Sequence, residues 1–534
     1  MQPIFRTDAK QPPSIDLFKP LPTGEGVIDE ATFRIIEVDA LFDVVNQCQT
    51  TAGKVSLYRS LTNPGKQREK IQAVQESLQE LDNNPQLEQS LKQLVAETAV
   101  SEPFLYQLLY GTFLGMFGAS DKSEEIEGYG YEQYRKGTQC VVNLTEGLQA
   151  IQKPHSDYLS GLIKQIEHFS QSRLYSLIKG PAYITESGVK TQQEKKPWIP
   201  ALRFRPTLFK PIFIGIMIGL FFLLNLFPIL EWMRIPGIVR NMAMIVGAPL
   251  LLAYIPVVGT FDRDSCIYKL RDEFRQSEDV QQMFEVLGQL DQLLSFKSYA
   301  DQFGSEMVFP RLIDSNQHAI QVEQAKNPIL AYNNPGYVGN HINLTDNRLL
   351  FITGPNSGGK TAFCKTIAQI QLLAQLGCKV PAQHAELVVA DFIFYQAPEF
   401  SSLSDGEGRF GAELKRTREI FMMSTERSLV ILDELSEGTT YEERMETSIN
   451  VLDGFFRKKV TTLLITHNHQ LVDHFINRQI GQAWQVEFAD DGVDHSGPTY
   501  HLIPGISRIS HADKIAKKIG FSKQDIDDHL GISI

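Results

Sequence analysis

The sequence predicts two fold classes in one chain, an α/β domain with a parallel sheet in the C-terminal half and an all-α region before it. Short apolar runs in the C-terminal half each end in a turn with polar residues, as buried parallel strands do. The first half instead repeats apolar residues at three- and four-residue steps, for example over 68–81, which indicates amphipathic helices. Two long apolar runs, at 211–230 and 241–261, interrupt the helical region.

Composition narrows the function classes. The chain has 534 residues, a length that suggests about three domains. Its 63 acidic residues outnumber its 51 basic residues, giving a net charge of −12, whereas dedicated nucleic-acid binders usually carry a basic excess. The five cysteines form no CxxC pair and no metal-ligand spacing, so we expect free thiols in a reducing compartment.

A glycine-rich turn lies between an apolar strand pattern at 348–353 and a helical pattern that starts at 362. The turn consists of Gly354, Pro355, Asn356, Ser357, Gly358, Gly359, Lys360 and Thr361. Glycines let backbone N–H groups converge on phosphate oxygens, and the following helix adds its positive N-terminal dipole. Lys360 would reach the β- and γ-phosphates, and the Thr361 hydroxyl would bind Mg²⁺. The pattern predicts a P-loop, and hence a Mg²⁺-dependent ATPase.

Two further strand patterns deliver polar side chains at their C-terminal ends. The apolar run that starts at Ser428 ends in Asp433 and Glu434, and the run at 461–466 is followed by His467. We expect Asp433 to hold Mg²⁺ and Glu434 to orient the attacking water. The His467 imidazole would hydrogen-bond the γ-phosphate. Together with Lys360, Glu434 and His467 are the predicted catalytic residues.

A fourth segment, 403–407, reads Leu-Ser-Asp-Gly-Glu and precedes a predicted helix at 409–424. It is similar to the signature turn of ABC-type ATPases, which completes the nucleotide site of the opposite subunit. The predicted signature residues are Ser404, Gly406, Glu407 and Gly408. This likeness implies a homodimer in which two ATPase domains meet head to tail.

The C-terminal half resembles the ATPase domain of the MutS mismatch-repair family. The family's GPNMGGKS, LLDE-GRGT and ATHYHEL segments are matched at 354–361, 431–439 and 465–471, and 28–64 is similar to the start of its helical core and lever domain. The resemblance implies ATP and Mg²⁺ as cofactors and DNA as a partner. It also implies that Tyr337 lies against the adenine of the nucleotide.

Several departures from the family pattern bear on function. About 26 residues precede the core match, and no Phe-X-Glu occurs in the sequence. Mismatch readers of the family use such an aromatic wedge to sense a weak base step. We therefore expect no direct mismatch recognition by that device. Glu437 stands where the family has arginine, and 408–411 departs from the family's signature loop, which alters the expected dimer-facing surface.

The two apolar runs predict a membrane hairpin. Residues 211–230 and 241–261 carry no charge, and each run is long enough to span about 30 Å of hydrocarbon as a helix. Lys210 and two arginines flank the first run. We expect a lipid bilayer as a partner, with both large segments on the cytoplasmic side. The alternative is a hydrophobic hairpin buried in a soluble core.

We expect this division of the chain: a tail at 1–26, a helical core and lever domain at 27–205 and 262–322, the hairpin at 206–261, and the ATPase domain with a helical pair at 323–534. Two functions stay open. In the first, ATP-driven dimer closure moves the levers on DNA. In the second, the same movement is transmitted to a membrane or protein partner without DNA. The acidic balance, the missing wedge and the hairpin favour the second, and the family resemblance favours the first.

Overall fold

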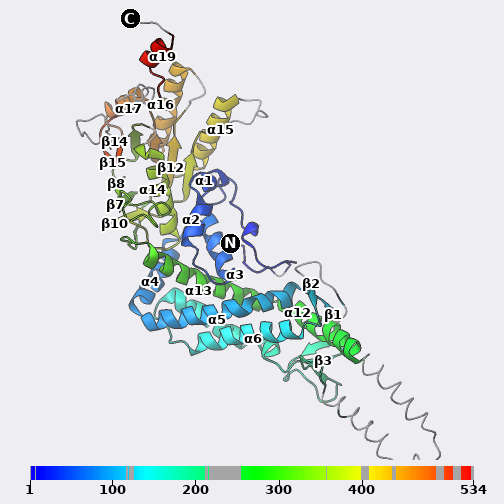
Figure 1. Ribbon diagram of the computed structural model, residues 1–534. Coiled ribbons are helices and arrows are strands. Elements are labelled where there is room, and N and C mark those ends of the chain that lie inside the picture. The colour runs from blue at the N-terminus through cyan, green and yellow to red at the C-terminus, as the bar shows by residue number, and fades with distance from the viewer. Residues whose placement is uncertain are drawn as a thin grey trace, which may run out of the picture. The chain divides into compact units, whose positions relative to one another are not determined.

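The computed structural model describes most of the chain, and its helices and strands fall into two compact units. The described residues are 2–6, 8–115, 118, 125–210, 215, 254–355, 358–398, 408–435, 440–488, 498–508 and 519–530. The helical unit comprises Met1–Ser14, Cys48–Ser56 and Asn84–Gln292. The sheet unit comprises Ile15–Gln47, Leu57–Asn83 and Leu293–Ile534. Figure 1 labels their elements.

The helical unit is built from long amphipathic helices and a few short strands. Its elements are α5 Pro85–Tyr110, β1 Thr112–Gly115, β2 Glu125–Glu127, α6 Tyr131–Ala150, α7 Asp157–Ser170, α8 Arg173–Lys179, β3 Tyr183–Thr185, β4 Gly188–Lys190, β5 Leu202–Arg203, η2 Arg263–Ile267 and α12 Tyr268–Arg275. Two helices, α3 Thr51–Thr62 and α13 Glu278–Gln302, have residues in both units. The helical character predicted from the three- and four-residue apolar steps is confirmed, but the region is not all-α, because it also contains the short strands β1–β5.

Aromatic stacking and buried carboxylates organise the core of the helical unit. The Phe5 ring stacks on Phe284 with centroids 4.8 Å apart, and Tyr106 stacks on Phe284 at 5.4 Å. At the start of α3, Glu102 accepts hydrogen bonds from the backbone N–H groups of Thr51 and Ala52, and Asp291 accepts from that of Thr50, the residue before the helix. These bonds satisfy amide groups that a helix start leaves without intrahelical partners, and the carboxylates complement the helix dipole.

The sheet unit contains two sheets with helices between their strands. Its helical elements are η1 Ile15–Leu17, α1 Glu30–Ile35, α2 Val38–Val45, α4 Arg68–Asn83, α14 Lys360–Gln375, α15 Gly408–Met423, α16 Tyr441–Arg457, α17 His469–Ile476 and α19 Lys523–His529. A four-stranded sheet has the order β6-β10-β7-β8, with β6 Arg311–Ile313, β7 Ile320–Ala325, β8 Asn340–Asn343 and β10 His384–Val388.

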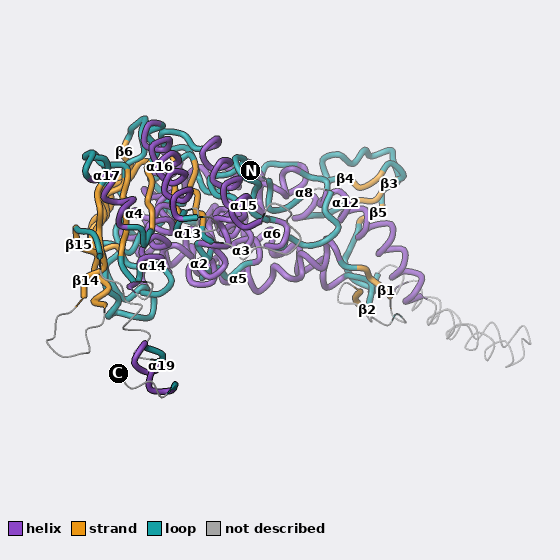
Figure 2. Tube along the Cα trace, turned by 90° about the horizontal axis from the view of Figure 1, so that it is seen from above, coloured by secondary structure: helices purple, strands orange, loops and turns teal. Residues whose placement is uncertain are grey.

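The second sheet carries the predicted nucleotide motifs. Its order is β11-β12-β13-β9-β14-β15, with β9 Leu349–Thr353, β11 Phe392–Gln396, β12 Ser428–Asp433, β13 Thr461–Ile465, β14 Gln482–Phe488 and β15 Pro498–Pro504. The first five strands in this order pair in parallel, and only β15 runs antiparallel. Figure 2 shows these strands between helices of the same unit. The α/β fold class with a parallel sheet is confirmed.

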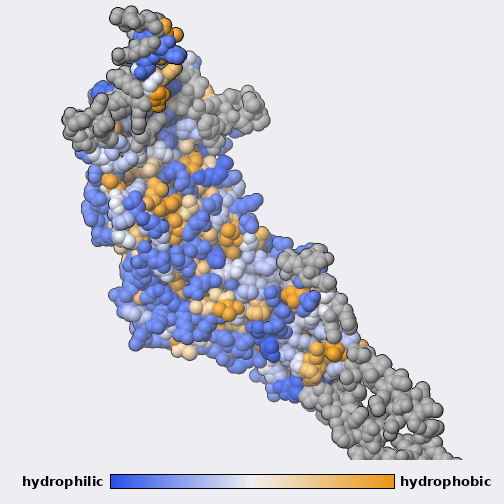
Figure 3. All heavy atoms as spheres, viewed as in Figure 1, coloured by the Kyte–Doolittle hydropathy of each residue, from blue (hydrophilic) through white to orange (hydrophobic). Residues whose placement is uncertain are grey.

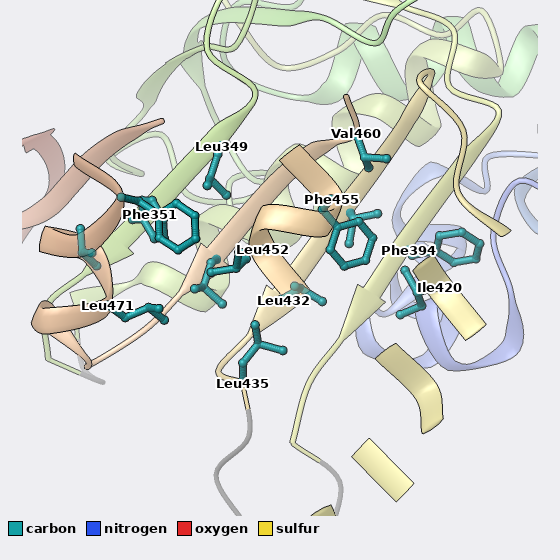
Figure 4. Packing of buried hydrophobic residues seen from close by; sticks show 14 residues of the cluster. Leu349, Phe351, Phe394, Ile420, Leu432, Leu435, Leu452, Phe455, Val460 and Leu471 are labelled. Atoms are coloured by element: carbon teal, nitrogen blue, oxygen red, sulfur yellow. The ribbon is translucent and has the colours of Figure 1, made fainter. Parts of the chain in front are cut away.

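One face of this sheet packs into an apolar core. Phe351 pairs in register with Leu464, and Leu464 with Leu432, so these side chains point to the same face. Leu452 and Phe455 of α16 and Phe475 of α17 complete the cluster, which Figure 4 shows from close by. All of these side chains are buried. The opposite face carries Leu350, Leu463 and Ile431, because side chains alternate along a strand.

Figure 3 shows a described surface on which polar residues predominate and apolar residues form small groups. In the helical unit, Trp198 is 92% exposed and Phe209 is 73% exposed. Val257 and Phe261 are also exposed. Phe209, Val257 and Phe261 lie within the predicted hairpin segment 206–261, and Trp198 precedes it in the sequence.

The prediction of a membrane hairpin requires correction. Among the described residues, no helix combines the length and the apolar character needed to cross a bilayer. The predicted spans 211–230 and 241–261 lie mostly outside the described residues, and 254–262 form a helix that continues into η2. The prediction rested on apolar length and on flanking basic residues, and apolar length does not distinguish a membrane span from a helix buried in a folded core. The predicted membrane localisation is therefore wrong, and the predicted lipid-bilayer partner has no support among the described residues.

Candidate active site

The glycine-rich turn lies between the central strand β9 and the start of α14. Gly354 has φ 130° and Gly359 has φ 83°, conformations that side chains with a Cβ rarely adopt. Gly358 lies against Val486, where an added Cβ would come within 2.6 Å of a valine methyl group. The turn therefore needs glycine for backbone conformation and for packing. Asn356 and Ser357, also predicted to bind ATP, lie outside the described residues.

Lys360 is the first residue of α14, and its ammonium group points back into the turn. Its Nζ donates hydrogen bonds to the carbonyl oxygens of Gly354 at 2.6 Å and Pro355 at 2.8 Å. Burial lowers the pKa of Lys360 to about 8, and the Asp433 carboxylate opposes this shift. A buried ammonium is stabilised by negative charge, which phosphate groups bound in the turn would supply.

Thr361 and Asp433 come together from different elements. The Thr361 hydroxyl, in the first turn of α14, donates a hydrogen bond to Asp433 Oδ2 at the end of β12, across 3.1 Å. Burial raises the pKa of Asp433, while the Thr361 bond and the charge of Lys360 lower it. A hydroxyl and a carboxylate oxygen are ligands that suit Mg²⁺. Among the described residues, no three or more His, Cys, Asp or Glu side chains form a metal-binding group.

Glu434 and His467 follow two adjacent strands and meet beside Asp433. Glu434 has φ 63°, and its backbone N–H donates to Ile465 of β13 at 2.9 Å. His467 Nε2 lies 3.4 Å from Glu434 Oε1. The Glu434 side chain is 20% exposed and that of His467 is 45% exposed, so both face solvent at the edge of the sheet. A carboxylate held in this way can accept a proton from a water molecule.

Tyr337 lies in the segment before β8 and is half-buried. Burial raises the pKa of its phenol, and the Thr366 hydroxyl of α14 partly offsets that shift. The structure therefore brings Tyr337 to the helix that begins at Lys360. Of the four predicted signature residues, the structure describes only Gly408, which begins α15. Ser404, Gly406 and Glu407 lie outside the described residues.

Sequence reasoning did not single out Tyr395, which lies near the Asp433 carboxylate. Tyr395 of β11 is buried, and the Asp433 carboxylate contributes to the upward shift in the pKa of its phenol. The available signal was a tyrosine after three apolar residues of β11, the strand that pairs with the Asp433 strand. The pairing of β11 with β12 joins residues far apart in the sequence. The tyrosine therefore could not be assigned to the site before the register of these strands was known.

Comparison with family models decides the identity of the fold. The model of MutS domain V matches residues 350–530, which include β9, the turn, α14 and the ends of β12 and β13. The chain belongs to the MutS family. The model of MutS domain III matches residues 31–296, the helical region. This MutS-family protein therefore combines domain III with domain V, the ATPase domain of the family.

Individual relatives agree with this assignment. The chain is 38% identical over 241 residues to the DNA mismatch repair protein msh3 of Aspergillus terreus, covering 43% of this chain and 21% of the relative. It is 30% identical over 260 residues to the DNA mismatch repair protein MutS of Prochlorococcus marinus, covering 47% and 28%. It is 30% identical over 251 residues to the Endonuclease MutS2 of Levilactobacillus brevis, covering 47% and 31%. The match spans less than a third of each relative's length.

Proposed function

We propose that this MutS-family protein binds ATP with Mg²⁺ and hydrolyses it at the carboxyl edge of the six-stranded sheet. The observation that carries the proposal is the convergence of three strand ends there. The Thr361 hydroxyl bonds Asp433, and Glu434 lies beside His467. Carboxyl ends of parallel strands are where open α/β sheets bind ligands.

Each residue has a distinct task in the proposed reaction. Lys360, held in the turn, neutralises the β- and γ-phosphates, while Thr361 and Asp433 supply oxygen ligands to the metal or its water shell. Bound Mg²⁺ neutralises charge on the phosphate oxygens. Glu434 orients the attacking water and accepts its proton. The His467 imidazole lies beside the Glu434 carboxylate and hydrogen-bonds the γ-phosphate.

We further propose that the nucleotide sites are completed in a homodimer and that the ATPase cycle acts on DNA. Asp433 and Glu434 are only partly buried, so a second copy could contact them. Support for DNA comes from the relatives, two of which carry the name DNA mismatch repair protein. Because the match spans less than a third of their length, mismatch specificity is not part of the proposal.

The test is steady-state ATPase activity of the full-length protein with and without duplex, mismatched and branched DNA. Measurements at about 50 and 200 mM salt show how much of the DNA effect depends on contacts to DNA phosphates, because that contribution falls steeply with salt. We expect DNA to change the turnover rate, with a smaller effect at the higher salt. Activity that is robust and indifferent to every DNA would contradict the DNA part and leave the ATPase part intact. The Glu434→Gln variant serves as the control for contaminating ATPases.

A second candidate, coupling of the ATPase cycle to a protein partner without DNA, is favoured by the net charge of −12. An acidic chain is a poor general binder of a polyanion. The same DNA titration separates the two, because only the first predicts a salt-dependent response. Fluorescence anisotropy of labelled duplex gives an independent measure of binding that needs no turnover.

A further inference from the structure

A buried phenol lies on the inner side of the proposed metal site. Tyr395 of β11 pairs in parallel register with Ile431 of β12, and Asp433 follows two positions further along β12. Because side chains alternate along a strand, Ile431 and Asp433 point to one face of the sheet, and Tyr395 points to that same face. The Tyr395 and Asp433 side chains are therefore diagonal neighbours, a separation that an aromatic side chain spans.

The hydroxyl of Tyr395 is buried and makes no hydrogen bond of standard geometry within the described part of the chain, although it lies within interaction range of the Asp433 carboxylate. Buried hydroxyl groups in folded proteins are almost always hydrogen-bonded, so one without a partner calls for an explanation. The Asp433 carboxylate lies close enough to raise the pKa of the phenol, in addition to the larger effect of burial. A tyrosine hydroxyl carries one O–H donor, which is available to this carboxylate.

The backbone of Tyr395 is held in position independently of its side chain. Its N–H donates to the Thr32 hydroxyl at 3.0 Å, and the neighbouring Ile393 N–H donates to Val27 at 2.7 Å. These bonds keep the outer edge of β11 paired, so the strand that carries the phenol is fixed beside β12. A fixed phenol loses little conformational entropy when it forms one more hydrogen bond.

The Asp433 carboxylate has room for a second donor. Oδ2 accepts from the Thr361 hydroxyl, and an ionised carboxylate offers about four lone-pair sites. While Thr361 donates its proton to Asp433, the lone pairs of its oxygen stay available to a cation. A second donor to the Asp433 carboxylate would hold the orientation of this group toward the cation.

We propose that Tyr395 is a positioning residue: its hydroxyl donates to Asp433 when Mg²⁺ and nucleotide bind, and orients that carboxylate for the metal. This inference rests on the ATP site proposed above and extends it by one residue. Outer partners of metal-binding carboxylates typically change metal affinity by 10- to 100-fold when they are removed. The role assigned to Tyr395 is thus in metal affinity and not in nucleotide contact.

The test is Tyr395→Phe in the full-length protein, which removes only the hydroxyl. Binding of a fluorescent ATP analogue is titrated with MgCl₂ and, separately, in excess EDTA. We expect the Mg²⁺ concentration for half-maximal binding to rise about 10-fold, while affinity in EDTA stays unchanged. Tyr299→Phe is the matched control, because Tyr299 is also a buried tyrosine of the sheet unit, and its hydroxyl bonds the Pro328 carbonyl at 3.4 Å.

The thermal midpoint of the nucleotide-free protein gives a second readout. Because the Tyr395 hydroxyl makes no hydrogen bond of standard geometry there, Tyr395→Phe should leave the midpoint unchanged or raise it. An unchanged Mg²⁺ dependence would overturn the inference, as would an equal loss of affinity with and without Mg²⁺. Failure of the proposed function is distinguishable, since the wild-type protein would then show no Mg²⁺-dependent binding of the analogue.

Discussion

Arg416 of α15 and Asp29 form an ion pair in which Arg416 Nη2 lies 2.6 Å from Asp29 Oδ2. Asp29 is 2% exposed, and its other oxygen caps α1 by accepting from the Thr32 N–H at 2.9 Å. The same α1 supplies the Thr32 hydroxyl to β11. The Asp29 carboxylate therefore links α15 to α1, the helix that contacts the edge strand β11.

Removal of Arg416 should destabilise the sheet unit. Arg416→Ala leaves the Asp29 charge buried without its partner, and we expect a loss of about 3 kcal/mol in the free energy of unfolding. Asp29→Asn retains an oxygen for the α1 cap and should cost less than Asp29→Ala, by about 1 kcal/mol. Denaturant unfolding measures both differences. Arg418→Ala, at an exposed position of the same helix, is the control, and an equal loss there would contradict the assigned pair.

Glu434→Gln should separate binding from hydrolysis. The amide cannot accept the proton of the attacking water, so we expect turnover to fall by about 10²- to 10⁴-fold. Affinity for ATP should be retained, because Lys360 and the glycine turn are unchanged. Single-turnover hydrolysis and analogue binding are the measurements, with Glu446→Gln on the exposed side of α16 as the control. Normal turnover in Glu434→Gln would rule out the assigned role.

Lys360→Ala should remove nucleotide binding. Two charge-assisted hydrogen bonds to phosphate, at about 1.5 kcal/mol each, correspond to an affinity loss on the order of 100-fold. Lys365→Ala on the same helix removes a lysine that pairs with Glu37 at 2.7 Å, and it should bind the analogue nearly as well as wild type. Equilibrium titration checks both variants. Retained affinity in Lys360→Ala would exclude the phosphate contact.

His318 should make stability depend on pH. Its ring is fully buried, with Nε2 3.4 Å from Gln371 Oε1, and burial lowers the pKa of His318 from 6.5 to about 4, assisted by the charge of Arg348. Between these values the unfolded chain binds more protons than the folded one. The contribution of His318 to the free energy of unfolding is therefore fully present above pH 6.5. It falls by about 3 kcal/mol as the pH drops to 4.

The measurement for His318 is denaturant unfolding of wild type and His318→Gln at pH 7 and pH 4.5. Glutamine does not titrate, so the variant should lose less stability on acidification than the wild type. The His318→Gln protein is expected to be less stable at pH 7, because a buried side chain is exchanged. Identical acid sensitivity in the two proteins would show that another group dominates.

The elements of the ATPase domain were predictable because their signals are local. The apolar run before Gly354 forms β9, and the helical pattern after it forms α14, which begins at Lys360. Apolar periodicity follows from burial of one face, so it survives in any single sequence. The membrane interpretation failed for a related reason: apolar length is also local, but it does not distinguish lipid from protein as the surroundings of a helix.

By itself, the sequence determined the glycine-rich turn with its flanking strand and helix, the place of the acidic pair at a strand end, and the family. Tertiary structure alone decided which side chains meet. Thr361 and Asp433 are 72 positions apart and touch, whereas Arg416 reaches Asp29 across 387 positions. Such contacts follow from strand order and register, which are cooperative properties of the packed sheet. The place of Tyr395 behind Asp433 belongs to the same class, because it exists only once β11 pairs beside β12.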